Sequence, residues 1–316
     1  MDPSTAAQPL DPTFRSYTAP QAAAYAAGRG SYSPALYEYI LSQHKNNGGQ
    51  SDLLLDVGCG TGSVARDLGR FFDRAMGLDP GEKMIDTARG IGGETRGGEE
   101  VDYRVCGAED IDKVEQIVEG SVDLVVAAMA AHWFDMSKFW AAAARVLKPG
   151  GSVALWTCAS LYCHPSTRNA PQVQQILSHL EDVTLAPYVL ESNRMSRSLY
   201  AKLPLPWTCD PPIAEFDQSS FIRREWDVDG VLTNGQDFFA GGGETTRADL
   251  GSALGTASMV TRWREANPWL ANGEKDCVKM AMQELREVLG VDKGSEQEIK
   301  LKTGSSTVVL FLRKQV

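Results

Sequence analysis

Asp56-Val57-Gly58-Cys59-Gly60-Thr61-Gly62 is a glycine-rich stretch that follows a short apolar run and precedes a helical pattern. The apolar run, Leu53–Val57, is typical of a buried parallel strand. The pattern from Ser63 to about Phe72 predicts a helix. A G-x-G-x-G turn between a strand and a helix lets backbone N–H groups approach a ligand that a Cβ atom would exclude. The stretch therefore predicts an α/β fold with a ligand at the end of its first strand.

The spacing of the glycines restricts the kind of ligand. Dinucleotide sites use G-x-G-x-x-G, and here Gly62 comes one residue early. No Lys-Ser or Lys-Thr pair follows the loop, so a Walker phosphate loop is excluded. The positive end of the following helix favours a ligand with an anionic group. Asp56, directly before the loop, suits the charged amine of an amino-acid tail better than a pyrophosphate.

Further strands and helices alternate downstream of this loop. Strands are expected at Ala75–Leu78, Asp102–Cys106, Val122–Ala127 and Ser152–Thr157, with helices at Gly81–Arg89 and Met136–Leu147. Such alternation builds βαβ units with right-handed crossovers, hence a doubly wound α/β fold with a mostly parallel sheet. At the chain end, Glu298–Lys302 and Thr307–Leu312 suggest a β-hairpin around Gly304-Ser305-Ser306, which would complete a seven-stranded sheet.

The same patterns divide the chain into four parts. Residues 1–45 are interpreted as a loose tail and helices that cover the ligand, the helical pattern running from about Pro20 to His44. Residues 46–159 form the α/β core. Residues 160–272 lose the alternation and are rich in Pro, Trp, Arg and Phe, so we expect a mostly helical substrate cap. Residues 273–316 supply a final helix and the hairpin.

Composition excludes several classes of function. The 316 residues carry a net charge of −10, so an acidic surface argues against nucleic acid as a partner. No apolar run approaches the roughly 18 residues that span a bilayer, and the N-terminal stretch lacks the pattern of a signal peptide. The six cysteines match no zinc spacing, and with only four histidines no metal site is expected. Unpaired cysteines fit a reducing, cytoplasmic setting.

Two acidic residues follow later strands at positions suited to a nucleoside. Asp79 ends the second strand about 20 positions past the loop, where a carboxylate can accept both ribose hydroxyls. The alternative is a helix N-cap for the helix that follows. Glu109, in the turn Gly107-Ala108-Glu109 after the third strand, could accept a hydrogen bond from an adenine amine. Its alternative is a surface glutamate at a helix start.

Taken in order, these motifs resemble those of class I S-adenosylmethionine-dependent methyltransferases, with a Rossmann-like core. The resemblance rests on Asp56–Gly62, Asp79, Ala108-Glu109 and Arg145–Gly151, and it covers about residues 50–160. A closer resemblance, to the fungal trans-aconitate 3-methyltransferase family, rests on Ala131-His132-Trp133-Phe134-Asp135. Outside the core, the N-terminal segment from Tyr25 to Ser33, the segment Thr256-Ala257-Ser258 with Trp263, and Val308–Arg313 are also similar to that family, although Gly30 and Ala257 replace its Pro and Trp.

The resemblance implies that S-adenosyl-L-methionine is the cofactor and assigns residues to it. Asp56 would lie beside the methionine amine, and Tyr25 and Arg29 would fold over the cofactor, with Arg29 facing its carboxylate. For Tyr25, core packing of an N-terminal helix is an equal alternative. The full set of expected cofactor residues is Tyr25, Arg29, Asp56, Gly58, Cys59, Gly60, Asp79, Pro80, Met84, Ala108, Glu109, Ala128 and Trp133.

The acceptor side is less defined by the sequence. His132, at the end of the fourth strand, could be a general base, or it could pack with Trp133 as a wall of the site. A carboxylate acceptor would need no base, because methyl transfer from a sulfonium depends mainly on proximity and orientation. The aromatic and arginine content of the cap makes Trp156, Arg194, Arg197 and Trp263 candidates for binding an acidic acceptor.

We therefore expect methyl transfer to a small molecule. The acceptor would be a carboxylate or hydroxyl, either of a small acid such as trans-aconitate or of a larger intermediate of fungal secondary metabolism. The alternatives are a non-methylating reaction in the same fold, such as a cyclisation in natural-product biosynthesis, and a binding protein without activity. The intact glycine loop argues against the last of these.

Overall fold

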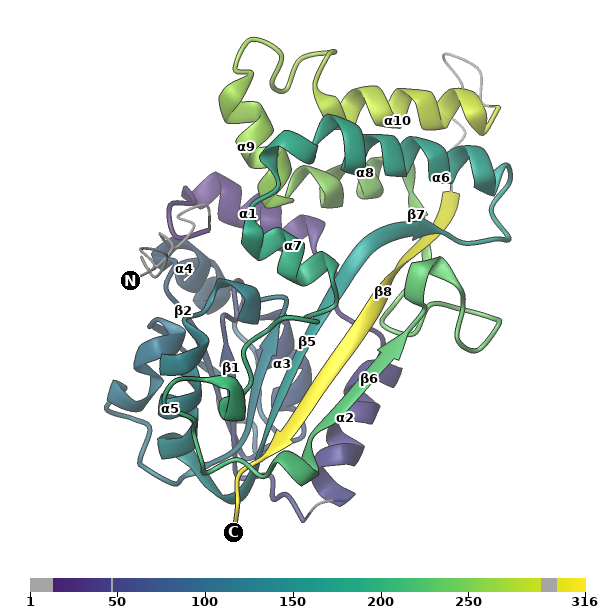
Figure 1. Cartoon of the computed structure of the whole chain (residues 1–316). Helices are drawn as coiled ribbons and strands as arrows, with labels where there is room; N and C mark the ends of the chain where they lie inside the picture. The colour runs from purple at the N-terminus through teal and green to yellow at the C-terminus, as the bar shows by residue number, and fades with distance from the viewer. Residues whose placement is uncertain (1–13, 47, 291–299) are drawn as a thin grey trace, which may run out of the picture.

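The computed structural model describes residues 14–46, 48–290 and 300–316, so the predicted loose tail at residues 1–13 lies outside the described residues. One sheet organises this part of the chain (Figure 1), with strand order β3-β2-β1-β4-β5-β8-β6 and β7 pairing with the end of β8. β1 to β5 pair in parallel, and β8 runs antiparallel to β5 and β6. The doubly wound, mostly parallel α/β fold is thus confirmed. The strands are β1 Leu53–Val57, β2 Arg74–Asp79, β3 Asp102–Val105, β4 Val122–Ala128, β5 Leu147–Cys163, β6 Ile222–Trp226, β7 Glu244–Thr246 and β8 Lys300–Arg313.

Helices cover both faces of the sheet and build a second layer above its carboxyl edge. The single N-terminal helical pattern is two helices, separated by an extended segment from Arg29 to Ser33 and restarted by Pro34 at the first helical position. The α-helices are α1 Ala19–Gly28, α2 Pro34–Asn46, α3 Ser63–Gly69, α4 Glu82–Ile91, α5 Met136–Val146, α6 Ala170–His179, α7 Glu191–Arg197, α8 Arg247–Gly255, α9 Ser258–Ala266 and α10 Cys277–Val288. Two short 3-10 turns, η1 Ala108–Lys113 and η2 Ala131–Trp133, follow β3 and β4.

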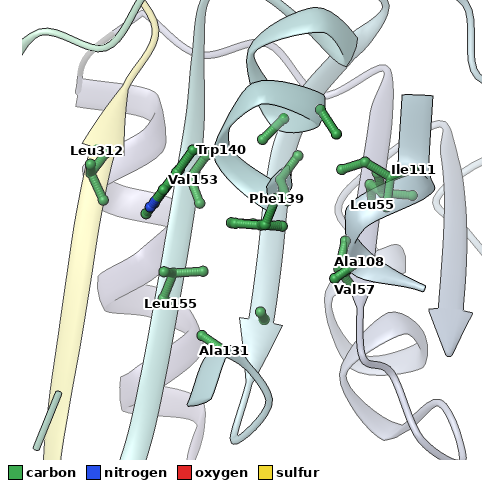
Figure 2. Close-up of a cluster of buried hydrophobic side chains, with 14 of the residues drawn as sticks. Leu55, Val57, Ala108, Ile111, Ala131, Phe139, Trp140, Val153, Leu155 and Leu312 are labelled. Atoms are coloured by element: carbon green, nitrogen blue, oxygen red, sulfur yellow. The ribbon is translucent and has the colours of Figure 1, made fainter. Parts of the chain in front are cut away.

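The alternation of side chains along β1 explains the two cores. Leu53, Leu55 and Val57 point to the face that is covered by α5 and η1, where Phe139 packs among them (Figure 2). Leu54 points to the opposite face and packs with side chains of α2, α3 and α4. By the same alternation Asp56 lies on the face of Leu54, where it is fully buried at the end of the strand.

The predicted C-terminal hairpin is wrong. β8 is one continuous strand from Lys300 to Arg313, and the residues expected to form its turn are paired with β5, Gly304 opposite Tyr162 and Ser305 opposite Leu161. Gly304 serves packing rather than a turn, because a Cβ atom there would lie 2.1 Å from the Phe238 ring. Residues 298 and 299 of the expected first strand lie outside the described residues.

The cap region contributes to the sheet as well as covering it. β6, within the segment expected to be helical, pairs with β8 and forms an edge of the sheet. Its exposed charged residues Arg224 and Glu225 are typical of an edge strand and hid the apolar pattern that marks an interior one. β5 and β8 continue past the core toward α6 and α10 (Figure 1), so cap and core share two long strands.

Candidate active site

A cavity of about 1960 Å³ lies at the carboxyl ends of the parallel strands. This is the edge at which open α/β sheets bind ligands. All thirteen residues that the sequence assigned to a cofactor line this cavity: Tyr25, Arg29, Asp56, Gly58, Cys59, Gly60, Asp79, Pro80, Met84, Ala108, Glu109, Ala128 and Trp133. The volume exceeds the roughly 300–1,000 Å³ of common ligand pockets, so the cavity has room for more than one small molecule.

The glycine loop approaches the cavity with its backbone. Gly58 donates its N–H to the Leu78 carbonyl at 2.7 Å, which fixes the loop on the end of β2. Gly58 and Gly60 both have positive φ, +70° and +54°, which favours glycine. A Cβ atom on Gly58 would lie 2.5 Å from that of Ala130, whereas one on Gly60 would enter the cavity, with the Tyr25 ring 3.8 Å away. The loop therefore forms a cradle that a side chain would fill.

Asp79 joins the loop to the next element. Its Oδ2 accepts the Gly60 N–H at 2.9 Å, and its Oδ1 accepts the Gly81 N–H at 2.8 Å. Burial raises the pKa of Asp79, and these two backbone hydrogen bonds oppose that rise. Asp79 is not the cap residue of α4, whose N-cap is Gly81. Its carboxylate lines the cavity while it accepts these two backbone hydrogen bonds, so acceptor capacity remains for ribose hydroxyls.

Asp56 is a buried carboxylate that lines the cavity. Its side chain is 1% exposed, and neither carboxylate oxygen has a hydrogen-bond partner within the described part of the chain. Burial raises its pKa to about 7. The nearby backbone N–H of Ala65 opposes this rise, and the charge of Asp79 adds to it. Buried carboxylates are ordinarily paired, so this carboxylate fits a ligand that brings a cation or hydrogen-bond donors to it.

Glu109 and Trp133 form the wall opposite the loop. Oε1 of Glu109 accepts the backbone N–H of Asp135 at 2.9 Å, which holds η1 against the start of α5. The Trp133 ring meets the Phe14 ring edge-on, with centroids 5.7 Å apart. Both rings line the cavity, so together they form an aromatic wall.

The N-terminal segment and the cap meet above this wall. Arg29 donates from Nε to Thr256 Oγ1 at 2.9 Å, and its guanidinium lies 5.5 Å from the centre of the Tyr25 ring. Tyr25 packs on Phe14 and Tyr17. Two of the three segments that resemble the fungal family outside the core are therefore in direct contact, and they enclose the cavity from one side.

His132 does not line the cavity. Its Nδ1 and the Tyr200 hydroxyl form a hydrogen bond of 3.0 Å beneath the cavity wall. Burial lowers the pKa of His132 to about 3, so its ring stays neutral. This geometry favours the alternative that His132 packs behind the wall of the site, because its ring is hydrogen-bonded to a buried tyrosine and does not line the cavity where an acceptor would lie.

The four expected acceptor residues also have other partners. Trp156 is fully buried on β5 against the Tyr32 ring, and Trp263 packs in the apolar cluster of the cap. Arg194 is exposed and forms an ion pair with Glu191, whereas Arg197 pairs with Glu181 and Asp182. None of these four residues lines the cavity. Local ion pairs account for the two arginines and packing accounts for Trp263, whereas the buried Trp156 Nε1 has no hydrogen-bond partner among the described residues.

Sequence reasoning missed several residues that do line the cavity. Tyr32, Cys158, Leu161, Arg247 and Ser305 come from four different segments of the chain. Tyr32 had a signal in the N-terminal resemblance. The other four had none, because only the unexpected continuation of β5 and β8 brings them to the cavity.

Three expectations from composition concern metal ligands, membrane-spanning helices and the pairing of cysteines. Within residues 14–46, 48–290 and 300–316, no group of His, Cys, Asp and Glu side chains is arranged to hold a metal ion. None of the helices in these ranges combines the length and the apolar character that crossing a bilayer requires. All six cysteines are free thiols.

Comparisons with known proteins agree with this geometry. Residues 55–155 match the Methyltransf_11 family, described as a methyltransferase domain. A candidate methyltransferase of Dictyostelium discoideum is 33% identical over 129 residues, which are 41% of this chain and 44% of that protein. CRG1 of Saccharomyces cerevisiae, a candidate S-adenosylmethionine-dependent methyltransferase, is 27% identical over 156 residues, 49% of this chain and 50% of CRG1. The matches thus span about half the length of these curated relatives.

The fold has a solved counterpart over most of its length. The structure of a candidate type II methyltransferase from Anaeromyxobacter dehalogenans superposes with a TM-score of 0.60 at 24% identity, covering 91% of this chain and 97% of that one. At this identity the likeness concerns the fold alone. The family match and the shared fold lead to one conclusion: residues 55–155 form a methyltransferase domain of the Methyltransf_11 family.

Proposed function

We propose that this chain transfers a methyl group from S-adenosyl-L-methionine to a small-molecule acceptor held in the same cavity. The observation that carries the proposal is Asp56, a buried carboxylate without a partner among the described residues, placed at the edge of a glycine cradle. The α-amine of a methionine tail would supply the missing hydrogen-bond donors and a compensating charge. The sulfonium cofactor supplies an already activated methyl group when it is bound.

The other cavity residues fit the remaining parts of the cofactor. Asp79 can accept the ribose hydroxyls while keeping its two backbone hydrogen bonds. Glu109 Oε2, the oxygen not bonded to Asp135, can accept the adenine amine, and the rings of Trp133 and Phe14 enclose the base. Arg29 is held by Thr256 above the cavity, where it can bind a carboxylate.

The acceptor would occupy the part of the cavity bounded by Tyr32, Leu161 and Ser305. The protein contributes proximity and exclusion of water there, which suffices for a nucleophile such as a carboxylate. Because His132 does not line the cavity, is hydrogen-bonded to Tyr200 and has a pKa lowered to about 3, we assign it no proton transfer. The net charge of −10 argues against a nucleic-acid acceptor and favours a small molecule enclosed in the cavity.

Product mass with parallel detection of S-adenosylhomocysteine tests this proposal. Purified protein is mixed with S-adenosylmethionine and either trans-aconitate or a panel of carboxylic acids and phenols. A product heavier by one methylene, formed with an equal amount of S-adenosylhomocysteine, is the expected result. A product of unchanged mass would instead indicate a cyclisation or similar reaction, and a protein that binds neither cofactor form would refute the proposal.

A further inference from the structure

The cavity extends well beyond the part that a cofactor would fill. Cys158 of β5 lines the cavity and is paired with Thr307, and Cys163, the last residue of β5, is paired with Thr303. The five residue steps from Cys158 to Cys163 correspond to about 16 Å of extended chain at roughly 3.3 Å per residue. Leu161, Thr303 and Ser305 line the cavity along this length. The floor of the cavity is therefore a two-stranded ribbon that leads away from the methyl donor.

Apolar and small residues enclose this ribbon. Leu250 of α8 and Val278 and Met282 of α10 line the cavity and belong to the apolar cluster of the cap. On another side lies the glycine run Gly241–Gly243, where a Cβ atom on Gly243 would meet nothing within 4 Å. A Cβ atom on Gly242 would instead lie 2.9 Å from Phe238, so the open space is at Gly243. Open space in a cavity with an apolar wall suits an extended hydrocarbon portion of a ligand.

A cation stands at the far end of the ribbon. Arg247 directly follows β7, whose last residue Thr246 is paired with Lys300. Lys300 is seven residues from Thr307 along β8 (307 − 300), which is about 23 Å at the rise of an extended strand. Arg247 lines the cavity and is half-buried.

The charge of Arg247 is not matched by a carboxylate. In the described ranges it has no ion pair or hydrogen bond, whereas Arg264, another cation of the lining, is bonded to Asp276 at 2.7 Å. The two acidic residues closest to Arg247 in sequence have other partners. Glu244 forms an ion pair with Lys300 at 3.5 Å, and Asp249 accepts a hydrogen bond from the Thr246 hydroxyl at 2.8 Å. A half-buried guanidinium in this setting is suited to an anionic group of a ligand.

We propose that the acceptor is an elongated amphipathic molecule with its anionic group remote from the methylated atom. Its nucleophile lies near Cys158 beside the cofactor, its apolar body lies along Leu161 and Met282, and its anion binds Arg247. This inference rests on the proposed function, of which it specifies the substrate class. A small polyacid would leave the apolar ribbon and Gly241–Gly243 without a contact.

Calorimetry on the protein saturated with S-adenosylhomocysteine tests the substrate class with butanoate, octanoate and dodecanoate as probes. Affinity should increase with chain length. Arg247→Met should weaken dodecanoate by about tenfold or more, the loss expected for a hydrogen-bonded charge, and Arg247→Lys should restore part of it. Arg194→Met is the matched control, because Arg194 is an exposed arginine that does not line the cavity.

A second pair of variants tests the apolar body. Gly243→Leu should weaken dodecanoate more than butanoate, while Gly90→Leu, at another glycine with open space around its Cβ, should change neither. Affinity that is equal for all three acids, absent binding of dodecanoate, or an Arg247 variant that behaves like the Arg194 control would overturn the inference. Loss of S-adenosylhomocysteine binding by the unmodified protein would refute the proposed function itself, so the two failures are distinguishable.

Discussion

Asp56 links stability and cofactor binding through a single side chain. Its buried carboxylate has a pKa raised to about 7, so holding it charged at neutral pH opposes folding. Asp56→Asn removes this charge. We expect the variant without cofactor to be more stable at neutral pH by about 1 kcal/mol or more. It should bind S-adenosylhomocysteine at least about tenfold more weakly, because the charge-assisted contact with the amine is lost. Thermal unfolding and calorimetry check the two effects, and a variant that lost stability would contradict the explanation.

Asp79 has a different role from its neighbour, because its carboxylate already accepts two backbone N–H groups. Asp79→Ala removes the anchor of Gly60 as well as the acceptor for the ribose hydroxyls. We expect cofactor affinity to fall by about 1.5–3 kcal/mol. Calorimetry with S-adenosylhomocysteine measures the loss, and Asp73→Ala, which removes an exposed carboxylate paired with Arg96, is the control. Unchanged affinity in the Asp79 variant would exclude this residue from the site.

At the scale of elements, the buried pair His132 and Tyr200 joins η2 of the core to the segment after α7 of the cap. Truncating either partner leaves a buried polar atom unsatisfied, which costs about 1–3 kcal/mol. We therefore expect His132→Ala and Tyr200→Phe each to destabilise the fold, and the double variant to lose less than the sum of the two. Urea unfolding of the four proteins measures the coupling. Strictly additive losses would show that the hydrogen bond does not join the two elements.

Elements with a regular apolar period were predictable from sequence, and those defined by long-range pairing were not. β1 was readable because Leu53–Val57 is an uninterrupted apolar run ahead of the glycine loop. β6 was missed because an edge strand exposes charged residues, and β8 was divided because Gly304 is typical of a turn. The reason for a glycine at position 304 could not be predicted, because it is the packing of Gly304 against the Phe238 ring, and Phe238 is distant in the chain.

The candidate site follows the same division. The cofactor residues lie in short, contiguous motifs at strand ends, so all of them reached the cavity. The acceptor residues were chosen by type instead, and an arginine or tryptophan has several common partners besides a ligand. Arg194 forms an ion pair with Glu191, and Arg197 forms one with Glu181. Arg247 is the first residue of α8 and directly follows β7. The pairing of β7 with β8, which the sequence did not predict, positions it at the cavity.

At the scale of the whole molecule, two kinds of buried group oppose each other as the pH falls. His132 has its pKa lowered from 6.5 to about 3 by burial, and the pKa of His44 is lowered by the same cause. Below pH 6.5 the unfolded chain therefore binds protons that the folded chain does not, and stability is lost toward pH 3. Asp56 has the opposite sign. Its pKa rises from 3.8 to about 7, so the folded chain takes up the proton first and stability is gained as the pH falls through that window.

The opposition predicts pH profiles that differ between two variants. Relative to the unmodified protein, His132→Gln should gain stability as the pH falls below 6.5, because it lacks the buried imidazole that resists protonation. The advantage of Asp56→Asn should instead shrink as the pH falls from about 7 toward 3.8. Each single group contributes at most about 1.4 kcal/mol per pH unit. Urea unfolding of the three proteins without cofactor, over a series of pH values, measures both differences. If the free energy of unfolding of both variants follows that of the unmodified protein at every pH, neither group changes its proton affinity on folding. If the two differences change with pH in opposite directions, both groups are buried in the folded protein as described.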